Sequence, residues 1–269
     1  MTGIEHIQNS FETIKSQRRA ALILYYTLGF PDSKTSLDVI RAAAEAGADM
    51  IELGVPFSDP LADGPTIQYS TQAALEGGIS VKRCLDLTCD LRAGGLTKPM
   101  LLMGYTNPIL AYGPERFVSD ARQVGADGLI LPDLPLEEAE FLSRICRDHG
   151  MALVFLAFPA SPQDRLARLA EATSGFLYLA SITGVTGARN NLPPDLSDFI
   201  MRTKPVARTP LAVGIGISTP AQAAAVGKLV DGVIIGSALI NAVRSALDSG
   251  LSPVDAVNKF VSAIRAEIG

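Results

Sequence analysis

The sequence predicts an α/β protein with the (β/α)8 barrel fold, also called a TIM barrel, preceded by one extra N-terminal helix. Short apolar runs typical of buried strands alternate with longer amphipathic stretches typical of helices. Eight such strands can be counted, each followed by a helix or by a loop that leads to one. The length of 269 residues and the hydrophobic content of 48% suit one barrel, and no linker divides the chain. We therefore expect residues 1–269 to form a single domain.

The expected elements follow one another in regular order. Ile4, Ile7, Phe11 and Ile14 recur at intervals of three and four residues, which predicts an N-terminal helix that could cover the lower mouth of a barrel. The predicted strands are Ala21–Thr27, a strand from Met50 that carries Glu52, Met100–Gly104, Gly128–Pro132, Ala152–Leu156, Phe176–Ala180, Leu211–Val213 and Gly232–Gly236. Helices are predicted from Asp32 onward and around residues 81–93, 114–124, 136–149, 163–172, 194–203 and 220–228.

A short repeated pattern precedes three of these strands. Gly47-Ala-Asp49, Gly125-Ala-Asp127 and Val230-Asp231 each stand between the end of a helical pattern and the start of an apolar run. Stacked βα units produce this kind of weak internal periodicity. The pattern therefore favours the barrel over an open, doubly wound sheet.

Composition and charge exclude several classes of function. The net charge of −5 gives no basic surface for nucleic acid, and no apolar run reaches the roughly 20 residues of a membrane span. The N-terminus lacks the pattern of a signal peptide, so we expect a cytoplasmic protein. Three cysteines and two histidines lie at spacings that suggest neither a disulfide framework nor a metal site, and no metal is expected.

Two carboxylates are the candidate catalytic groups. Glu52 interrupts an otherwise apolar strand, where an unpaired buried charge would be costly. Such a residue is acceptable at the carboxyl end of a barrel strand, where ligands bind. Asp63 lies in the loop that follows. From these residues alone, an edge-strand charge and an ordinary Asp-Gly turn stay open as alternatives.

Glycine clusters follow the last three predicted strands. They are Gly184-Val-Thr-Gly187, Gly214-Ile-Gly216 and Gly236-Ser237. Glycine lets backbone N–H groups approach an anion, and barrels commonly bind phosphate in the loops after strands seven and eight. Any one cluster could be a simple turn, but three after successive strands favour phosphate binding. The long polar loop 181–194, with Thr186, is predicted to be a lid over the site, with plain flexibility as the alternative.

A long motif resembles the signature of the tryptophan synthase alpha chain family. It runs from Glu52-Leu-Gly-Val-Pro-Phe-Ser-Asp to Pro-Leu-Ala-Asp63-Gly-Pro-Thr-Ile-Gln68. The resemblance extends, in the same order as in the family, through residues 26–29, 103–108, 127–135, 181–189 and 214–218 to 236–237. It thus covers nearly the whole chain.

The resemblance implies a (β/α)8 barrel that cleaves indole-3-glycerol phosphate to indole and glyceraldehyde 3-phosphate. It implies that Glu52 is the acid and base that transfers protons, and that Asp63 accepts a hydrogen bond from the indole N–H. Thr186 would hold Asp63 when the lid closes. By resemblance, the phosphate ligands are Gly187, Gly216, Gly236 and Ser237, and the indole pocket is formed by Tyr25, Ile67, Met103, Ile130, Tyr178 and Ile234.

The resemblance also implies a partner. Family members work with a beta chain, in an α2β2 heterotetramer, and the beta chain carries pyridoxal phosphate; no cofactor is expected in this chain. Pro56, Asp59 and the Asn107-Pro108 loop are expected to contact that partner. Tyr25 and Met103 stand where many members have Phe and Leu, and Phe30 stands where many have Asp, which affects the shape of the pocket rather than the reaction.

Three alternatives to an alpha subunit stay open. The chain could be the same lyase working without a partner, a non-catalytic subunit that binds phosphate ligands and activates a partner, or another phosphate-binding barrel such as a sugar-phosphate isomerase. The presence of both Glu52 and Asp63 argues against a pure binding subunit, and the long motif around Glu52 argues against an isomerase.

Overall fold

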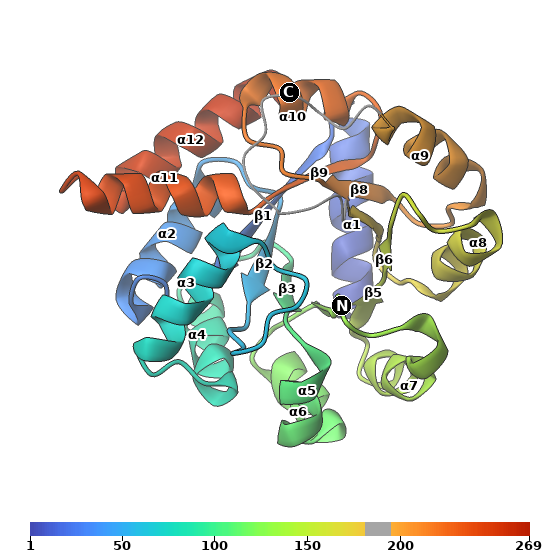
Figure 1. Ribbon diagram of the computed structural model, residues 1–269, viewed down its shortest axis with the longest axis horizontal. Coiled ribbons are helices and arrows are strands. Elements are labelled where there is room, and N and C mark those ends of the chain that lie inside the picture. The colour runs from blue at the N-terminus through green and yellow to red at the C-terminus, as the bar shows by residue number, and fades with distance from the viewer. Residues whose placement is uncertain (181–194) are drawn as a thin grey trace.

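The computed structural model describes residues 1–180 and 195–269, and in this part of the chain nine parallel strands form one sheet. The strand order is β5-β4-β3-β2-β1-β9-β8-β7-β6, so the two ends of the sheet are β5 and β6, which are neighbours in the chain. The sheet therefore curves into a nearly closed barrel with helices around it (Figure 1), and the predicted (β/α)8 fold is confirmed. The strands are β1 (Ala21–Thr27), β2 (Met50–Gly54), β3 (Met100–Met103), β4 (Gly128–Ile130), β5 (Ala152–Val154), β6 (Leu156–Ala157), β7 (Leu177–Ala180), β8 (Leu211–Gly214) and β9 (Gly232–Ile235).

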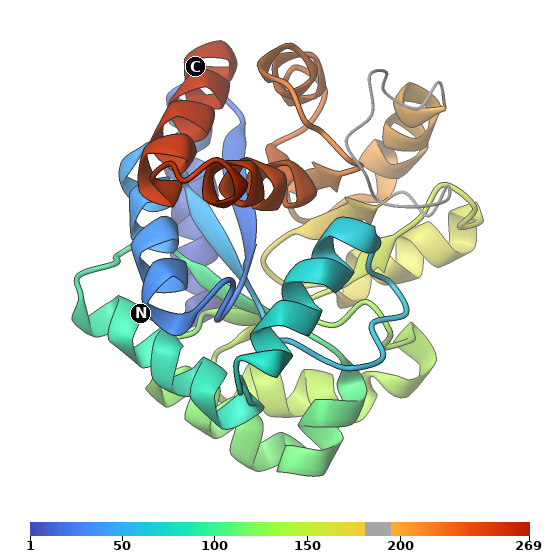
Figure 2. The same cartoon turned by 60° about the vertical axis from the view of Figure 1, so that its left-hand side comes forward.

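The helices alternate with these strands and cover the outside of the barrel. The C-terminal helix α12 packs against α2, so the last helix of the chain lies beside a helix from its N-terminal part (Figure 2). The helices are α1 (Gly3–Ser16), α2 (Ser33–Glu45), α3 (Pro65–Glu76), α4 (Val81–Ala93), α5 (Thr106–Tyr112), α6 (Pro114–Gln123), α7 (Glu140–Asp148), α8 (Gln163–Ala172), α9 (Leu196–Thr203), α10 (Pro220–Gly227), α11 (Ser237–Asp248) and α12 (Pro253–Ile268), with short 3-10 turns at Leu136–Glu138 and Lys204–Val206.

The fifth barrel strand differs from its prediction. One strand was expected over Ala152–Leu156, but the structure divides it into β5, which pairs with β4, and β6, which pairs with β7. The division falls at Phe155, whose N–H donates to the Thr173 hydroxyl at 3.0 Å, while its carbonyl accepts from Tyr178 N–H at 3.1 Å. A side chain thus takes the place of a ladder partner, and the strand changes neighbours at this residue.

Some helices were missed or misassigned from the sequence. The α3 and α12 helices were not predicted, and Asn107 and Pro108, which were expected in a loop, lie in the first turn of α5. Proline is tolerated there because the N–H groups of the first turn have no intrahelical partner. The α3 helix likewise begins with Pro65, immediately after Gly64.

The N-terminal helix closes one end of the barrel, as predicted. Ile7, Phe11 and Ile14 of α1 are buried and join the cluster of side chains that fills the barrel interior. The ring centroids of Phe11 and Phe176 are 5.9 Å apart, and Phe176 is the residue before β7. Because this end is filled, a ligand can reach the interior only from the other end, where the strands have their carboxyl ends.

The repeated Asp pattern has a common structural role. Each of its three aspartates directly precedes a strand and bridges to the first part of the strand before it in the chain. The backbone N–H of each Asp donates to a carbonyl there, and its carboxylate accepts from the N–H of the same residue. The distances from backbone nitrogen to carboxylate oxygen are 2.8 Å for Leu22 and Asp49, 2.9 Å for Met100 and Asp127, and 2.8 Å for Leu211 and Asp231.

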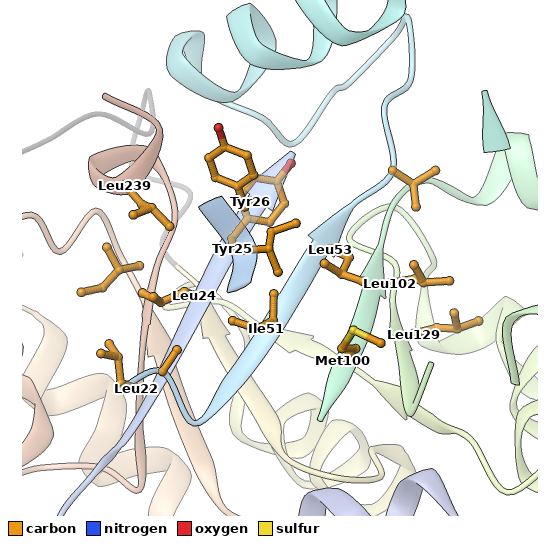
Figure 3. Close-up of a cluster of buried hydrophobic side chains, with 14 of the residues drawn as sticks. Leu22, Leu24, Tyr25, Tyr26, Ile51, Leu53, Met100, Leu102, Leu129 and Leu239 are labelled. Carbon is orange, nitrogen blue, oxygen red and sulfur yellow. The ribbon is translucent and has the colours of Figure 1, made fainter. Parts of the chain in front are cut away.

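Alternate residues of each strand face the barrel interior and the helices. On β1 and β2, Leu22, Leu24, Ile51 and Leu53 belong to the outer core beneath the helices (Figure 3). Ile23, between Leu22 and Leu24, and Met50, just before Ile51, belong to the interior cluster. This period of two places Glu52 on the same side as Met50, inside the barrel.

Candidate functional site

Glu52 is fully buried inside the barrel near the carboxyl end of β2. Its neighbours in the parallel register are Tyr25 on β1 and Leu101 on β3. The side chain is 0% exposed, and among the described residues neither carboxyl oxygen has a hydrogen-bond partner. Burial without a compensating charge favours the neutral acid and raises the pKa of Glu52 to about 8. Glu52 is the middle residue of β2 and not its last one, and β2 lies between β1 and β3, which excludes the edge-strand alternative.

Asp63 lies in the loop between β2 and α3. Its backbone is held by hydrogen bonds within this region, from its N–H to the carbonyl of Pro60 at 3.1 Å and from the Gln68 amide to its own carbonyl at 2.8 Å. The side chain is partly buried, and burial raises the pKa of its carboxyl to about 6. A hydrogen bond from Tyr105 acts in the opposite direction and favours the ionised form.

A cavity opens at the carboxyl end of the barrel directly beside Glu52. Most of the predicted site residues line it, although they come from distant parts of the sequence. Its described walls are Tyr25, Glu52, Ile67, Met103, Tyr178, Gly214, Gly216, Ile217, Ile234, Gly236, Ser237 and Ala238. A larger hollow of about 980 Å³ lies at the opposite end of the barrel, but the carboxylates along it are exposed. The cavity beside Glu52 is therefore the candidate active site.

The apolar wall of the cavity fits a flat aromatic ligand. Five of the six residues predicted for an indole pocket line it: Tyr25, Ile67, Met103, Tyr178 and Ile234. The sixth, Ile130, is fully buried in the interior cluster with Tyr178 and Ile234, and it is not among the described residues that line the cavity. Its contact with a ligand stays a prediction.

Glycines bring the tyrosines of this wall close to the barrel backbone. A Cβ atom at Gly54 would lie 2.3 Å from the Tyr25 hydroxyl oxygen, and one at Gly214 would lie 2.3 Å from that of Tyr178. Only glycine leaves room for these rings at the two positions. The two glycines are therefore part of the shape of the cavity.

The opposite wall is suited to an anion. Gly236 and Ser237 lie at the start of α11, and within residues 1–180 and 195–269 no side chain caps this helix end. The first N–H groups of a helix lack intrahelical partners and attract negative charge. Gly216, after β8, has a φ of +78°, a conformation that favours glycine, and it lines the same cavity. Two further predicted residues, the phosphate ligand Gly187 and the lid residue Thr186, lie outside the described residues.

The residues predicted to contact a partner lie in the β2–α3 loop and in the first turn of α5, after the carboxyl ends of β2 and β3. Asp59 and Asn107 are exposed, and Pro108 is half-buried. Pro56 is buried, so it affects such a surface through the shape of the β2–α3 loop rather than through its own side chain.

Tyr105 was missed by the sequence analysis. It is the residue before α5, and its hydroxyl accepts a hydrogen bond from the N–H of Ala62, the neighbour of Asp63, 43 positions earlier in the chain. The resemblance included the segment 103–108, but no local pattern singles out this tyrosine. Its position becomes evident only when the loops after β2 and β3 are placed side by side.

The described part of the chain was also searched for metal ligands and membrane segments. No group of three or more His, Cys, Asp or Glu side chains in residues 1–180 and 195–269 is arranged to hold a metal ion. No helix within the same ranges is long and apolar enough to cross a membrane.

Comparison with known proteins gives consistent results. The family described as "Tryptophan synthase alpha chain" matches residues 11–268. The chain is 44% identical over 262 residues to a tryptophan synthase alpha chain of Chloroflexus aurantiacus, covering 97% of each chain, and 42% identical over 264 residues to that of Gluconacetobacter diazotrophicus, covering 98% of this chain and 96% of the relative.

Solved structures agree with the sequence comparison. A tryptophan synthase subunit alpha from Legionella pneumophila superposes with a TM-score of 0.91 at 35% identity, covering 100% of this chain and 98% of that one. A chain of Mycobacterium tuberculosis tryptophan synthase gives a TM-score of 0.88 at 38% identity, covering 97% of each chain.

Proposed function

This chain belongs to the tryptophan synthase alpha chain family, and we propose that Glu52 and Asp63 carry out its reaction, the cleavage of indole-3-glycerol phosphate in tryptophan biosynthesis. The products are indole and glyceraldehyde 3-phosphate, which makes the enzyme a carbon–carbon lyase. The observation that carries the assignment is the burial of Glu52, without a charged partner, beside a cavity at the carboxyl end of the barrel.

The raised pKa gives Glu52 its first role. At neutral pH the side chain is largely the neutral acid, and it can donate its proton to C3 of the indole ring. The ring then carries a positive charge that is shared with the indole nitrogen. The ionised carboxylate of Asp63 accepts the hydrogen bond of the indole N–H and stabilises that charge.

The second role of Glu52 follows from the first. After it has given up its proton, its carboxylate accepts the proton of the glycerol hydroxyl next to the ring. The carbon–carbon bond breaks as the carbonyl of glyceraldehyde 3-phosphate forms, and the bonding electron pair restores the aromatic indole. Glu52 is protonated again at the end, so the residue is regenerated.

The two walls of the cavity orient the substrate for these steps. In this proposal, Tyr25, Met103 and Tyr178 contact the indole ring. The backbone N–H groups of Gly236 and Ser237, together with Gly216, bind the phosphate. Gly187 and Ile130 are kept as proposed contacts on the family resemblance alone.

The family also implies a beta-chain partner, and we propose an α2β2 assembly. In this proposal Asp59 and Asn107, which are both exposed, contact the partner, and indole leaves towards it. Pyridoxal phosphate belongs to the beta chain in this proposal. The residues of the alpha chain supply proton transfer, charge stabilisation and phosphate binding without it.

The test is the release of indole from indole-3-glycerol phosphate, measured with and without a beta chain. Wild type is expected to be weakly active alone and much more active with its partner, and Glu52→Gln and Asp63→Asn to lose nearly all activity. Glu45→Gln, which alters an exposed carboxylate at the end of α2, is the matched control.

Each other outcome has a definite meaning. High activity that does not respond to the beta chain would identify a lyase that works alone. Full activity of Glu52→Gln would show that Glu52 does not transfer the protons. No activity of the wild type in any condition would favour a non-catalytic subunit that only binds phosphate ligands.

A further inference from the structure

We infer that Tyr105 is a positioning residue, whose hydroxyl group holds the β2–α3 loop at the residue next to Asp63 and thereby keeps the carboxylate of Asp63 in place. This inference rests on the role proposed above for Asp63. Tyr105 itself is not among the residues that line the cavity in the described part of the chain.

The first support is the hydrogen bond between the Tyr105 hydroxyl and the β2–α3 loop. The backbone N–H of Ala62, the residue before Asp63, donates to the hydroxyl oxygen at 3.1 Å. Since the N–H can only donate, the tyrosine oxygen acts as acceptor towards Ala62, and its single proton is left to interact with the neighbouring carboxylate of Asp63. The hydroxyl therefore holds the loop at the residue next to Asp63.

The second support is the lack of other anchors for this loop. Ser58, Asp59, Leu61 and Ala62 are exposed, and the Leu61 side chain is 92% exposed. Within the described residues, the other hydrogen bonds of residues 56–64 connect the loop to itself or to α3. In the described part of the chain, the Tyr105 hydroxyl thus supplies the hydrogen bond that joins the β2–α3 loop to the loop after β3. Its ring adds a contact with Phe57, with ring centroids 5.5 Å apart.

The third support is the rigidity of Tyr105 itself. The residue is 5% exposed, and its backbone neighbours are fixed to the next unit of the barrel. Gly104 N–H donates to the carbonyl of Ile130 at 3.1 Å, and both the N–H and the hydroxyl of Thr106 bind the carboxylate of Asp133 at 3.0 Å. A side chain anchored on both sides can hold its partner in one geometry.

The electrostatics of the contact act in the same direction. Burial and the charge of Asp63 raise the pKa of Tyr105, so its hydroxyl keeps the proton that it donates. The donated hydrogen bond lowers the pKa of Asp63, against the effect of burial. The other titratable groups that face this region are Tyr25, Tyr178 and Glu52, together with Asp133 next to Tyr105. Without Tyr105, Asp63 would be both less fixed and less readily ionised.

The variant that tests this inference is Tyr105→Phe, which keeps the ring against Phe57 and removes only the hydroxyl. In the complex with a beta chain, kcat for cleavage of indole-3-glycerol phosphate is expected to fall about tenfold with little change in KM, because the lost contact matters when charge develops. The acidic limb of the pH profile is expected to move to higher pH. The carboxyl midpoint of Asp63, followed by ¹³C NMR and assigned with Asp63→Asn, is expected to move in the same direction.

The chain offers a matched control in Tyr112→Phe. The Tyr112 hydroxyl also donates to a carboxylate, that of Asp120 at 2.7 Å, and its ring packs edge-on against Phe117. This pair lies on α5 and α6, outside the cavity wall. The control is expected to leave kcat and the pH profile unchanged.

The outcomes separate this inference from the proposed function. If Tyr105→Phe keeps the wild-type kcat, pH profile and Asp63 midpoint, Tyr105 is only a packing residue and the inference is wrong, while the proposed function stands. If the wild type does not cleave the substrate at all, the proposed function is wrong. The inference is then tested by the NMR measurement alone, and an unchanged carboxyl midpoint of Asp63 in Tyr105→Phe would overturn it.

Discussion

The hydroxyl group of Tyr25 lies against the backbone of Gly54, so close that a Cβ atom on Gly54 would be 2.3 Å from the hydroxyl oxygen. The two residues are on neighbouring strands, and Glu52, two residues before Gly54, is the register partner of Tyr25. The Tyr25 hydroxyl is also 3.4 Å from that of Thr27, which in turn bonds with Ser70 of α3 at 2.7 Å. A ring fixed in this way forms one wall beside the proposed acid and base.

The first prediction concerns this contact. Gly54→Ala is expected to displace the Tyr25 ring and to lower kcat/KM at least tenfold, because the nearest atoms belong to a buried, hydrogen-bonded side chain. Adding Tyr25→Phe removes the closest atom and is expected to restore part of the activity. Steady-state kinetics check both variants, with Gly77→Ala, at the end of α3, as the control. An active Gly54→Ala enzyme would show that the wall adapts freely.

The second prediction concerns pH. Asp63 must be ionised to accept the indole hydrogen bond, and its pKa of about 6 makes activity rise through that value. Glu52 must be protonated to donate to C3, and its pKa of about 8 makes activity fall as pH rises further. We expect kcat/KM to follow a bell-shaped curve with its maximum near pH 7. A profile that still rises above pH 9 would contradict the role of Glu52 as the initial acid.

The third prediction concerns stability. The pKa of Glu52 is higher in the folded protein than in the unfolded chain. The contribution of Glu52 to the free energy of unfolding is therefore fully present below the unfolded pKa, where the residue is protonated in both the folded and the unfolded state. Its contribution is lost as pH rises through the folded value of about 8. Glu52→Gln cannot ionise, so its free energy of unfolding relative to wild type should improve by roughly 4 kcal/mol between pH 4.5 and pH 8.

Denaturant unfolding at several pH values would measure this difference. Glu45→Gln, at an exposed position, again serves as the control. If the Glu52→Gln and wild-type curves stay parallel across this range, burial does not raise the pKa of Glu52.

The fourth prediction concerns the closed end of the barrel. The buried carboxylate of Asp127 binds Arg92, the His6 ring of α1 at 3.0 Å and the N–H of Met100 at 2.9 Å. Asp127→Ala is expected to lower the free energy of unfolding by about 3 kcal/mol, because it leaves buried donors without a partner.

The exposed ion pair of Lys34 and Asp38 on α2 provides the comparison. Asp38→Ala is expected to cost less than about 1 kcal/mol, since water screens that pair. Equal losses in the two variants, measured by denaturant unfolding, would mean that Asp127 is not a structural anchor.

The sequence by itself determined the class of fold and the two carboxylates. Strands buried on both faces appear as continuous apolar runs, so β1, β2 and β9 were recognisable, and Glu52 stood out because a carboxylate interrupts such a run. The repeated Asp49, Asp127 and Asp231 were visible because three βα units make the same hydrogen bonds at the same place.

Local patterns failed where a tertiary contact overrides them. The Asn-Pro pair in α5 and the Gly-Pro pair before α3 have the composition of turns, yet they begin helices that pack on the barrel. The division of the fifth strand depends on the Thr173 hydroxyl, 18 residues from Phe155.

Only the tertiary structure decided the environment of the site. The raised pKa of Glu52 results from burial by side chains of several strands, and the cavity joins residues from Tyr25 to Ala238. The hydrogen bond from Ala62, next to Asp63, to the Tyr105 hydroxyl joins two loops that are adjacent because β2 and β3 pair. Desolvation and hydrogen bonding depend on distances in space, whereas sequence patterns report on the period of one strand or helix.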